Sequence, residues 1–375
     1  MPDPAVPYVR YLQAIVHHAF NAPARSNVVA AELMAGRPAL SEANLFELRT
    51  FELLNHLRLF EYRAAAAKAA AILDAPPAAA SDTERAEVRN LLRIFRALED
   101  VPAQAVAVRR ASVVEVAGGR VPVTLGSESR SFVFDTGANL SVIMRSEAES
   151  LGLRIRQAGI DVGTITDVKA TADLAVADRL LIGGVELRNV VFLVMPDELL
   201  SFPDGHRIPG IVGFPPIDAL GEVRFRRDGR MEIPESISTG AGANLALAGL
   251  KLITVVGHRG GRFVCQFDSG ADTSDFYLPF FEARNTYVTT AGERTTLNAT
   301  GVGGKRHFEG YRLPRIEITV AGRSFRLDDV NVFTTPVRAE TYLYCNIGQD
   351  VLRQAPAYTL NLRSMSLTFD PEPGE

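Results

Sequence analysis

One short motif occurs twice in this chain, and its repetition limits the possible folds more than any other feature does. The first copy, "VFDTGA", contains Asp135, and the second, "QFDSGA", contains Asp268. Asp135 is followed 78 residues later (213 − 135) by Gly213 in "IVG", and Asp268 is followed 80 residues later (348 − 268) by Gly348 in "NIG". The matched spacing predicts that one structural unit is used twice.

The residues around both motifs have a β pattern. Runs rich in Val, Ile, Phe and Thr alternate with Gly, Asn and Asp turns, and each unit closes with a pair of short runs, "EVRFRRDGRMEI" and "YTLNLRSMSLTF". We therefore expect a mainly β fold with two homologous β lobes, over residues 106–236 and 250–375. The Gly- and Ala-rich residues 237–249 are expected to form the linker between them.

Residues 1–105 differ from the rest and are expected to form an all-α domain. "NLFELRTFELLNHLRLF" places apolar residues on one helical face, Ser41 precedes it as a helix start, and "YRAAAAKAAAIL" contains strong helix formers. Pro76 and Pro77 interrupt the pattern before "TERAEVRNLLRIFRALED" resumes it. The Ala-rich pair predicts a helical hairpin that resembles a tetratricopeptide-type repeat, with an irregular helical bundle as the alternative.

Composition narrows the class of protein. With 375 residues, 47% hydrophobic and 22% charged, the chain is typical of a globular protein of two or three domains. A net charge of −4 gives no general attraction to nucleic acid or to an anionic membrane, so neither is an expected partner. No apolar run is long enough to span a bilayer, and the first residues do not have the charged-then-apolar pattern expected of a signal peptide. A periplasmic or secreted location is expected if a signal peptide was removed before Met1, and a cytoplasmic one otherwise.

Metal and cofactor chemistry has no signature in this sequence. The six histidines are scattered without metal-ligand spacing, and no His-Glu-x-x-His motif occurs. The Gly-x-Ser-x-Gly nucleophile elbow, the phosphate loop and the dinucleotide fingerprint are missing as well. We therefore expect neither a metal nor a cofactor.

Taken together, the two motifs and their partner glycines resemble one enzyme family. The chain from about residue 106 to 372 is similar to a two-lobed bacterial aspartic protease, pepsin-like in being a single chain and retropepsin-like in its motifs. The family pattern is two apolar residues, Asp, Thr or Ser, Gly, and Ala or Ser, followed later by two apolar residues and Gly. Gln266 and Asn346 depart from it, because they are polar where the pattern has apolar residues.

The resemblance implies a mechanism that needs both copies of the motif. Asp135 and Asp268 would face each other across the lobe interface, where two neighbouring carboxyl groups share a proton. The ionised group takes a proton from a bound water, and the protonated group donates to the oxygen of the scissile carbonyl. The expected function is therefore an aspartic endopeptidase that hydrolyses peptide bonds in a peptide or protein substrate.

The resemblance also assigns roles to residues around the aspartates. Those expected to support the two catalytic loops are Thr136, Gly137, Ser141, Ser269, Gly270 and Ser274. Those expected to bind the substrate are Asn139, Asp272, Gly303 and Gly304, the last two within a Gly-rich segment at 298–311 that resembles a flap. The alternative for this segment is an ordinary exposed loop.

Two pairs of small residues lead to further expectations. Ala138 and Ala271 replace the hydroxyl residue that pepsins carry beside each aspartate, so the resemblance predicts a less acidic pair and an activity maximum at about pH 4 to 6.5.

Cys265 and Cys345 are on strands that the family fold places close together. We expect two free thiols, with a disulfide as the alternative.

Two other functions remain open. One is a relative of these proteases that has lost its activity and only binds peptides. The other is an adaptor in which the helical domain binds a protein partner. The presence of both Asp135 and Asp268 favours the protease over the inactive relative.

Overall fold

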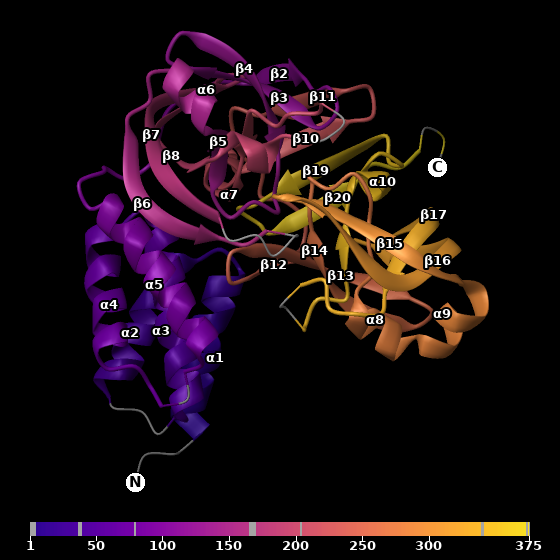
Figure 1. The fold of residues 1–375 in the computed structure, drawn as a ribbon, viewed down its shortest axis with the longest axis horizontal. Coiled ribbons are helices and arrows are strands. Elements are labelled where there is room, and N and C mark those ends of the chain that lie inside the picture. Colours follow the sequence, from indigo (N-terminus) through magenta and orange to yellow (C-terminus); the bar gives the residue numbers. More distant parts are fainter. Residues whose placement is uncertain are drawn as a thin grey trace.

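The structure is a computed structural model of the chain, and it shows a mainly β fold preceded by a helical region (Figure 1). The residues that it describes are 5–36, 40–78, 80–164, 170–202, 205–338, 341–372 and 374. The strands divide into a first β unit, residues 105–233, and a second β unit, residues 245–369. The fold class expected from the sequence is therefore confirmed.

The helical region contains more helices than the sequence predicted. Within the described residues 5–97 they are α1 (Ala5–Ala19), α2 (Pro23–Ala35), α3 (Glu42–Arg58), α4 (Tyr62–Asp74) and α5 (Asp82–Ala97). Ser41 caps α3 by accepting a hydrogen bond from the N–H of Asn44 (3.2 Å), and Ser81 and Glu84 form a capping box at α5. The expected hairpin corresponds to α3 and α4, whereas α1 and α2 were not predicted.

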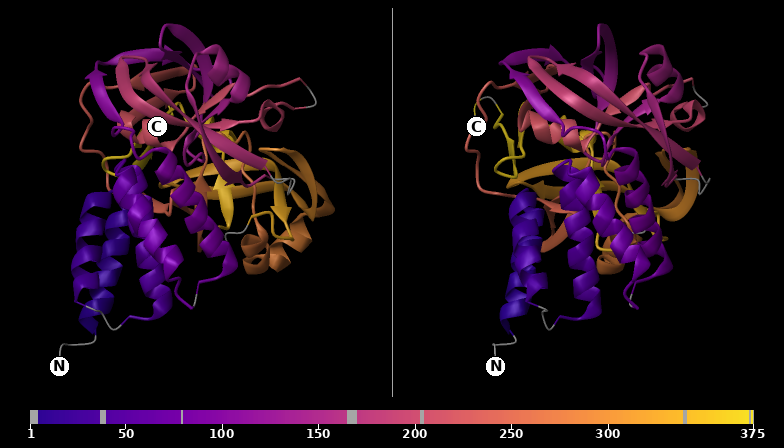
Figure 2. Two further views of the ribbon diagram at one scale, coloured as in Figure 1. Left: turned by 60° about the vertical axis from the view of Figure 1, so that its left-hand side comes forward. Right: turned by 90° about the vertical axis from the view of Figure 1, so that its left-hand side faces the viewer.

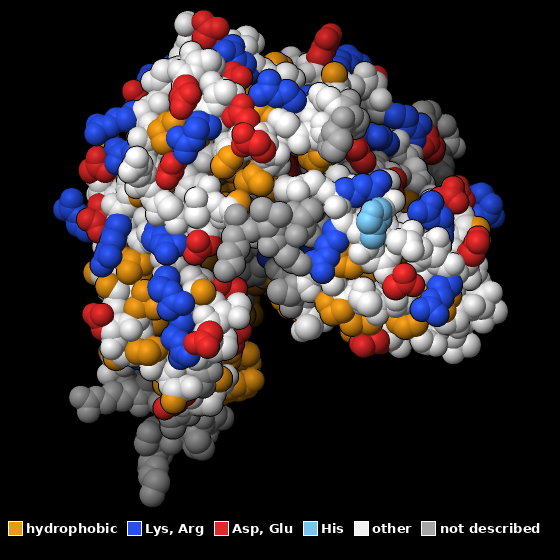
Figure 3. All heavy atoms as spheres, in the orientation of Figure 1, with side chains coloured by type: hydrophobic (Ala, Val, Ile, Leu, Met, Phe, Trp, Pro, Cys, Tyr) orange, Lys and Arg blue, Asp and Glu red, His pale blue; other side chains and the backbone are white. Residues whose placement is uncertain are grey.

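The first helix has apolar residues on opposite faces, which explains why its pattern was missed. Tyr11 and Ala14 are buried against neighbouring helices, whereas other apolar side chains along and just after α1 are exposed. These are Val6, Tyr8, Val9, Leu12, Val16 and Phe20. Figure 3 shows hydrophobic side chains gathered on the helical region, while charges of both signs are interspersed over the β units. The exposed apolar side chains widen the apolar surface of this helix well beyond the stripe that faces the neighbouring helices.

The part of the chain that the structure describes was also searched for membrane-spanning helices. None of its helices combines the length and the apolar character that crossing a bilayer requires.

The helical region and the first β unit share one hydrophobic core. Phe95 of α5 is fully buried in a cluster that also contains Ile160 and Leu174 of the first β unit. At the same boundary, Arg93 of α5 forms an ion pair with Asp161 (2.8 Å). Figure 2 shows the helices standing side by side below this unit. The helices α3, α4 and α5 therefore pack against the first β unit through this cluster.

An eight-stranded sheet forms most of the first β unit, in the order β1-β8-β5-β9-β4-β3-β7-β6. Its strands are β1 (Ala105–Arg109), β3 (Arg120–Leu125), β4 (Glu128–Phe134), β5 (Ser141–Met144), β6 (Ile155–Val162), β7 (Ala170–Ile182), β8 (Val185–Met195) and β9 (Gly210–Val212). The helical elements of this unit are α6 (Arg145–Ser150), the 3-10 turn η1 (Asp197–Leu200) and α7 (Phe214–Leu220). The strands β4 and β9 are parallel neighbours, which places the end of β4 beside the "IVG" loop.

A seven-stranded sheet forms most of the second β unit. Its strands are β12 (Leu245–Ala248), β13 (Lys251–His258), β14 (Gly261–Phe267), β15 (Glu293–Gly301), β16 (Gly304–Val320), β17 (Arg323–Phe333) and β18 (Cys345–Ile347). Its helices are α8 (Leu278–Ala283), α9 (Asn285–Ala291) and α10 (Gln349–Leu352). The strands β14 and β18 are parallel, as β4 and β9 are, so the two units repeat the same central pairing.

A third sheet joins the two units. Its five strands are, in order, β2 (Ser112–Glu115), β11 (Arg230–Ile233), β10 (Glu222–Arg226), β19 (Ala357–Asn361) and β20 (Ser366–Phe369). Strand β10 of the first unit pairs antiparallel with β19 of the second, with Val223 opposite Leu360. The two closing pairs of runs expected from the sequence are the hairpins β10–β11 and β19–β20, and they meet in this sheet.

The expected linker at residues 237–249 was too long. Residues 238–243 are exposed and contain no strand. The strand β12 follows and pairs antiparallel with β13. Leu245 and Leu247 alternate with alanines and are buried, which is the pattern of a strand with one face in a core. The Gly- and Ala-rich composition of the segment hid this alternation.

Candidate active site

Each of the two aspartates directly follows a strand in the centre of its sheet. The N–H of Asp135, after β4, donates to the carbonyl of Val212 (3.0 Å), and the N–H of Asp268, after β14, donates to that of Ile347 (3.0 Å). Both aspartates are half-buried. The same contact at both positions confirms the structural repeat that the matched spacings predicted.

Thr136 and Ser269 join the two aspartate loops through reciprocal hydrogen bonds. The N–H of Thr136 donates to Oγ of Ser269 (3.1 Å), and the N–H of Ser269 donates to Oγ1 of Thr136 (3.0 Å). The Thr136 hydroxyl donates to the carbonyl of Phe267, and the Ser269 hydroxyl to that of Phe134, both at 2.9 Å. Both side chains are buried, where the low dielectric strengthens these bonds. The cross-bonding that the resemblance implied is therefore present.

Gly137 and Gly270 bring the two carboxyl groups face to face. Each glycine N–H donates to Oδ1 of the aspartate in its own loop, at 2.7 Å for Asp135 and 3.1 Å for Asp268. A Cβ atom added at Gly137 would lie 2.8 Å from the carboxyl carbon of Asp268, and one added at Gly270 would lie 2.4 Å from that of Asp135. Each glycine thus lies against the opposite aspartate, and only a residue without a side chain fits there.

Burial and mutual repulsion shift the titration of both carboxyl groups. Burial, followed by the negative charge of Asp268, raises the pKa of Asp135 to about 8. Burial also raises the pKa of Asp268, and the positive charge of Arg338 opposes that rise. Two carboxyl groups in contact cannot both ionise readily, so the pair keeps one proton near neutral pH. A pair with one proton offers an acid and a base at the same place.

Ser141 and Ser274 connect each aspartate loop to the glycine loop beside it. The N–H of Gly213 donates to Oγ of Ser141 (3.1 Å), and the N–H of Gly348 donates to Oγ of Ser274 (2.9 Å). In the second unit the Ser274 hydroxyl also donates to Asp350 (2.6 Å). The loop contacts expected of both serines are therefore present, whereas Asp350 was missed because no repeated motif marks it.

Asn139 and Asp272, two of the residues expected to bind substrate, are exposed at the ends of the aspartate loops. Asp272 lies 3.6 Å from the guanidinium of Arg353. Asn139 lines a small cavity with Leu57 and Phe60, so the helical region lies next to this position. The two residues thus occupy matching positions in the repeat but have different neighbours.

Gly303 and Gly304, the remaining residues expected to bind substrate, form the tip of the hairpin β15–β16. Their φ angles of 87° and 116° are in the region that favours glycine. The N–H of Gly303 donates to the carbonyl of Leu199 in η1 (3.2 Å), and Val302 and Ala138 pack against the same apolar cluster of the first β unit. The tip of this hairpin therefore reaches from the second β unit to the first, beside the Asp135 loop.

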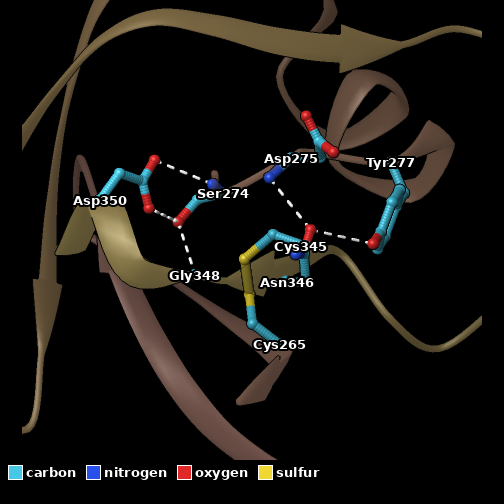
Figure 4. Close-up of a disulfide and its surroundings, with 8 residues drawn as sticks. All are labelled: Cys265, Ser274, Asp275, Tyr277, Cys345, Asn346, Gly348 and Asp350. Carbon is cyan, nitrogen blue, oxygen red and sulfur yellow. Dashed lines mark hydrogen bonds between the residues drawn. A yellow bond between two sulfur atoms is a disulfide. The ribbon is translucent and has the colours of Figure 1, made fainter. Parts of the chain in front are cut away.

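The two polar residues that depart from the family pattern, Gln266 and Asn346, are both hydrogen-bonded. Oδ1 of Asn346 accepts hydrogen bonds from the N–H of Asp275 (3.0 Å) and the hydroxyl of Tyr277 (2.9 Å), as Figure 4 shows. Oε1 of Gln266 accepts one from Nη1 of Arg338 (2.6 Å). Both amides are buried, and these partners offset the cost of burying them. Tyr277 and Arg338 were not singled out in the sequence, because neither belongs to a repeated motif.

Cys265 and Cys345 form a disulfide bond, so the expectation of two free thiols was wrong (Figure 4). The parallel pairing of β14 with β18 places Cys265 directly opposite Cys345, with their Cα atoms 4.7 Å apart. This distance is within the range that a disulfide spans. The bond links the strand that leads to Asp268 with the strand that leads to Gly348.

The described residues were also searched for metal ligands. Among them, no three His, Cys, Asp or Glu side chains come together in a group that could hold a metal ion.

Comparison with known proteins gives a family match that lies within the first β unit. A family model described as aspartyl protease matches residues 121–215, which include Asp135 and Gly213. The solved structures that are similar include a retropepsin-like aspartic protease from Rickettsia conorii, at 15% identity and a TM-score of 0.26, over 35% of this chain and 95% of that chain. No curated protein matches. The family match supports an aspartic protease in general terms.

Proposed function

We propose that this protein is a two-lobed aspartic endopeptidase, in which a water bound between Asp135 and Asp268 is activated to hydrolyse a peptide bond. The reciprocal hydrogen bonds of Thr136 and Ser269 carry the proposal, because they hold the two carboxyl groups in contact. Two acidic groups kept together at a cost to stability are typical of a functional site. The aspartyl protease match over the first copy supports the same conclusion.

The proposed reaction needs one proton on the pair. The ionised carboxylate takes a proton from the water, whose oxygen attacks the scissile carbonyl carbon. The protonated carboxyl group donates to the carbonyl oxygen, and the resulting tetrahedral intermediate breaks down with protonation of the leaving nitrogen. The raised pKa of Asp135 supports this reaction, because it keeps the acid available near neutral pH.

Substrate contacts complete the proposal. Asn139 and Asp272, at matching positions of the repeat, bind the substrate main chain. Gly303 and Gly304 cover the substrate as the tip of a flap. The exposure of Asn139 and Asp272 and the reach of the β15–β16 hairpin toward the Asp135 loop support these roles.

Replacing either aspartate tests the mechanism. We expect Asp135→Asn and Asp268→Asn each to lower kcat/KM on a cleavable peptide by at least about 100-fold, since each removes one of the two proton-transfer roles. The measurement is cleavage of a peptide library with and without pepstatin, followed by kinetics on a selected peptide. Asp178→Asn, which changes an exposed carboxylate on β7, is the matched control and should keep the parent activity.

The same experiment separates the protease from an inactive relative. A parent protein that binds library peptides without cleaving them across the acidic and neutral range would contradict the proposed hydrolysis. Cleavage that survives unchanged in either aspartate variant would contradict the two-carboxylate mechanism.

A further inference from the structure

The two aspartates do not have equivalent surroundings, although their strands pair in the same register. Val133 precedes Asp135 by two residues, whereas Gln266 precedes Asp268 by two residues. Gln266 is the last residue but one of β14, and the matching position of β4 carries the apolar Val133. The second unit therefore has a polar amide close to its aspartate where the first unit has an apolar side chain.

Gln266 holds a cation beside the second aspartate. Its Oε1 accepts a hydrogen bond from Nη1 of Arg338 (2.6 Å), and the guanidinium of Arg338 lies 5.2 Å from the ring centre of Tyr277. Tyr277 is itself fixed by its hydroxyl bond to Asn346 (2.9 Å). Gln266 is neutral, so it orients the guanidinium without cancelling its charge.

The charge of Arg338, which lies between β17 and β18, acts on Asp268 after β14 and on Tyr277 directly before α8. The negative charge of Asp268 in turn acts on Asp135 of the first β unit. Burial raises the pKa of Tyr277, which keeps the phenol neutral, and the charge of Arg338 opposes that rise. Burial raises the pKa of Asp275 to about 6, and the positive charge of Arg338 opposes this rise as well.

We propose that Arg338 is a positioning residue that keeps the negative charge of the pair on Asp268, so that Asp268 acts as the base and Asp135 as the acid. This inference rests on the proposed function. A guanidinium near one carboxylate favours its ionised form over that of a neighbour farther from the cation. The pKa of Asp135, raised by the charge of Asp268, agrees with this assignment.

The assignment fixes where each proton goes. Asp268 takes a proton from the water, the water oxygen bonds to the carbonyl carbon, and Asp135 gives its proton to the carbonyl oxygen. In the second step Asp268 gives its proton to the leaving nitrogen, the carbon–nitrogen bond breaks, and a hydroxyl of the intermediate returns a proton to Asp135. The pair ends in its starting state, with the proton on Asp135 and the charge on Asp268.

Arg338→Met tests the role of the charge in the active protein. We expect the acid limb of kcat/KM against pH to move up by about one pH unit, because without the cation a higher pH is needed to ionise the pair. Arg338→Lys, which keeps a positive charge, should move the limb much less. Arg315→Met, which removes an exposed arginine paired with Asp328, is the matched control and should leave the profile unchanged.

A second readout does not need activity. In an Asp135→Asn background, the Asp268 carboxyl titrates alone, and carbon-13 NMR of that carboxyl should show a pKa about one unit higher with Arg338→Met than without it. If this titration moves while the parent cleaves nothing, the inference stands and the proposed function fails. If the titration and the acid limb both stay in place in a folded Arg338→Met protein, or only KM changes, the inference is overturned. Arg338→Gln replaces Arg338→Met if the latter does not fold.

Discussion

The carboxyl group of Asp135 makes the folding stability depend on pH. Its pKa is about 8 in the folded protein and 3.8 without the protein environment, so between these values the folded state binds more protons than the unfolded state. The contribution of this carboxyl group to the free energy of unfolding is therefore fully present below about pH 4, and it is lost as the pH rises toward about 8. We expect the Tm of the parent to fall across this range, and that of Asp135→Asn to fall less because an amide does not ionise.

Thermal melts at about pH 4, 6 and 8 check this expectation. Asp178→Asn again serves as the control, since Asp178 is an exposed residue of β7, and its melts should follow the parent. A Tm that falls as steeply in Asp135→Asn as in the parent would contradict the role of this carboxyl group. The less acidic pair expected from Ala138 and Ala271 and the activity maximum both stay predictions.

Single residues could be predicted from the sequence where they belong to the repeat. Asp135, Thr136 and Gly137 recur as Asp268, Ser269 and Gly270, and their contacts are local or follow from joining the two copies. Arg338 could not be predicted in this way, because it contacts Gln266 from 72 residues away and belongs to neither repeated motif. A contact of this kind depends on the path of the loop between β17 and β18, which no local pattern encodes.

At the scale of elements, the disulfide between β14 and β18 should contribute strongly to stability. It joins cysteines 80 residues apart, and cross-linking a loop of that length restricts the unfolded chain. We expect the double substitution Cys265→Ala and Cys345→Ala to lower the free energy of unfolding by about 2–5 kcal/mol. Urea unfolding, followed by circular dichroism, measures the difference.

A reducing agent provides the control for this prediction. Reduction under unfolding conditions should shift the urea midpoint of the parent toward that of the double variant, and it should leave the variant unchanged. Equal midpoints for the oxidised and reduced parent would show that the bond does not stabilise the fold.

Elements were predicted well where capping and periodicity agree. The helices α3 and α5 begin directly after Ser41 and Ser81, whose side chains satisfy the first helical N–H groups. The strand β12 and the helices α1 and α2 were missed for a shared reason. Their apolar residues are small or occur on several faces, so burial in the tertiary structure decides their conformation and the local pattern does not.

At the scale of the whole molecule, the core shared by the helices and the first β unit should make them unfold together. Phe95 of α5 is fully buried among residues of both parts. We expect Phe95→Ala to destabilise the protein by about 3–5 kcal/mol and to increase hydrogen exchange in α5 and in β6 alike. Hydrogen-exchange mass spectrometry resolves the two segments, and the hairpin β15–β16 of the second unit should change less.

The matched control is Phe280→Ala in α8, an equally buried phenylalanine of the second β unit. It should increase exchange around α8 and β17 and leave α5 protected. Faster exchange in α5 without any change in β6 after Phe95→Ala would mean that the helices unfold independently of the sheet.

The sheet that joins the two units also bears on how such a chain can arise and diverge. The strands β10 and β19 hold matching places in the two copies and lie antiparallel, as they would if two identical chains had paired about a twofold axis. The exposed residues 238–243 connect the two copies within one chain. A symmetric pair of identical chains must accept every substitution twice, on both sides of its axis. A fused chain is free of that constraint, and so one half can acquire Gln266 and Arg338 while the other keeps Val133.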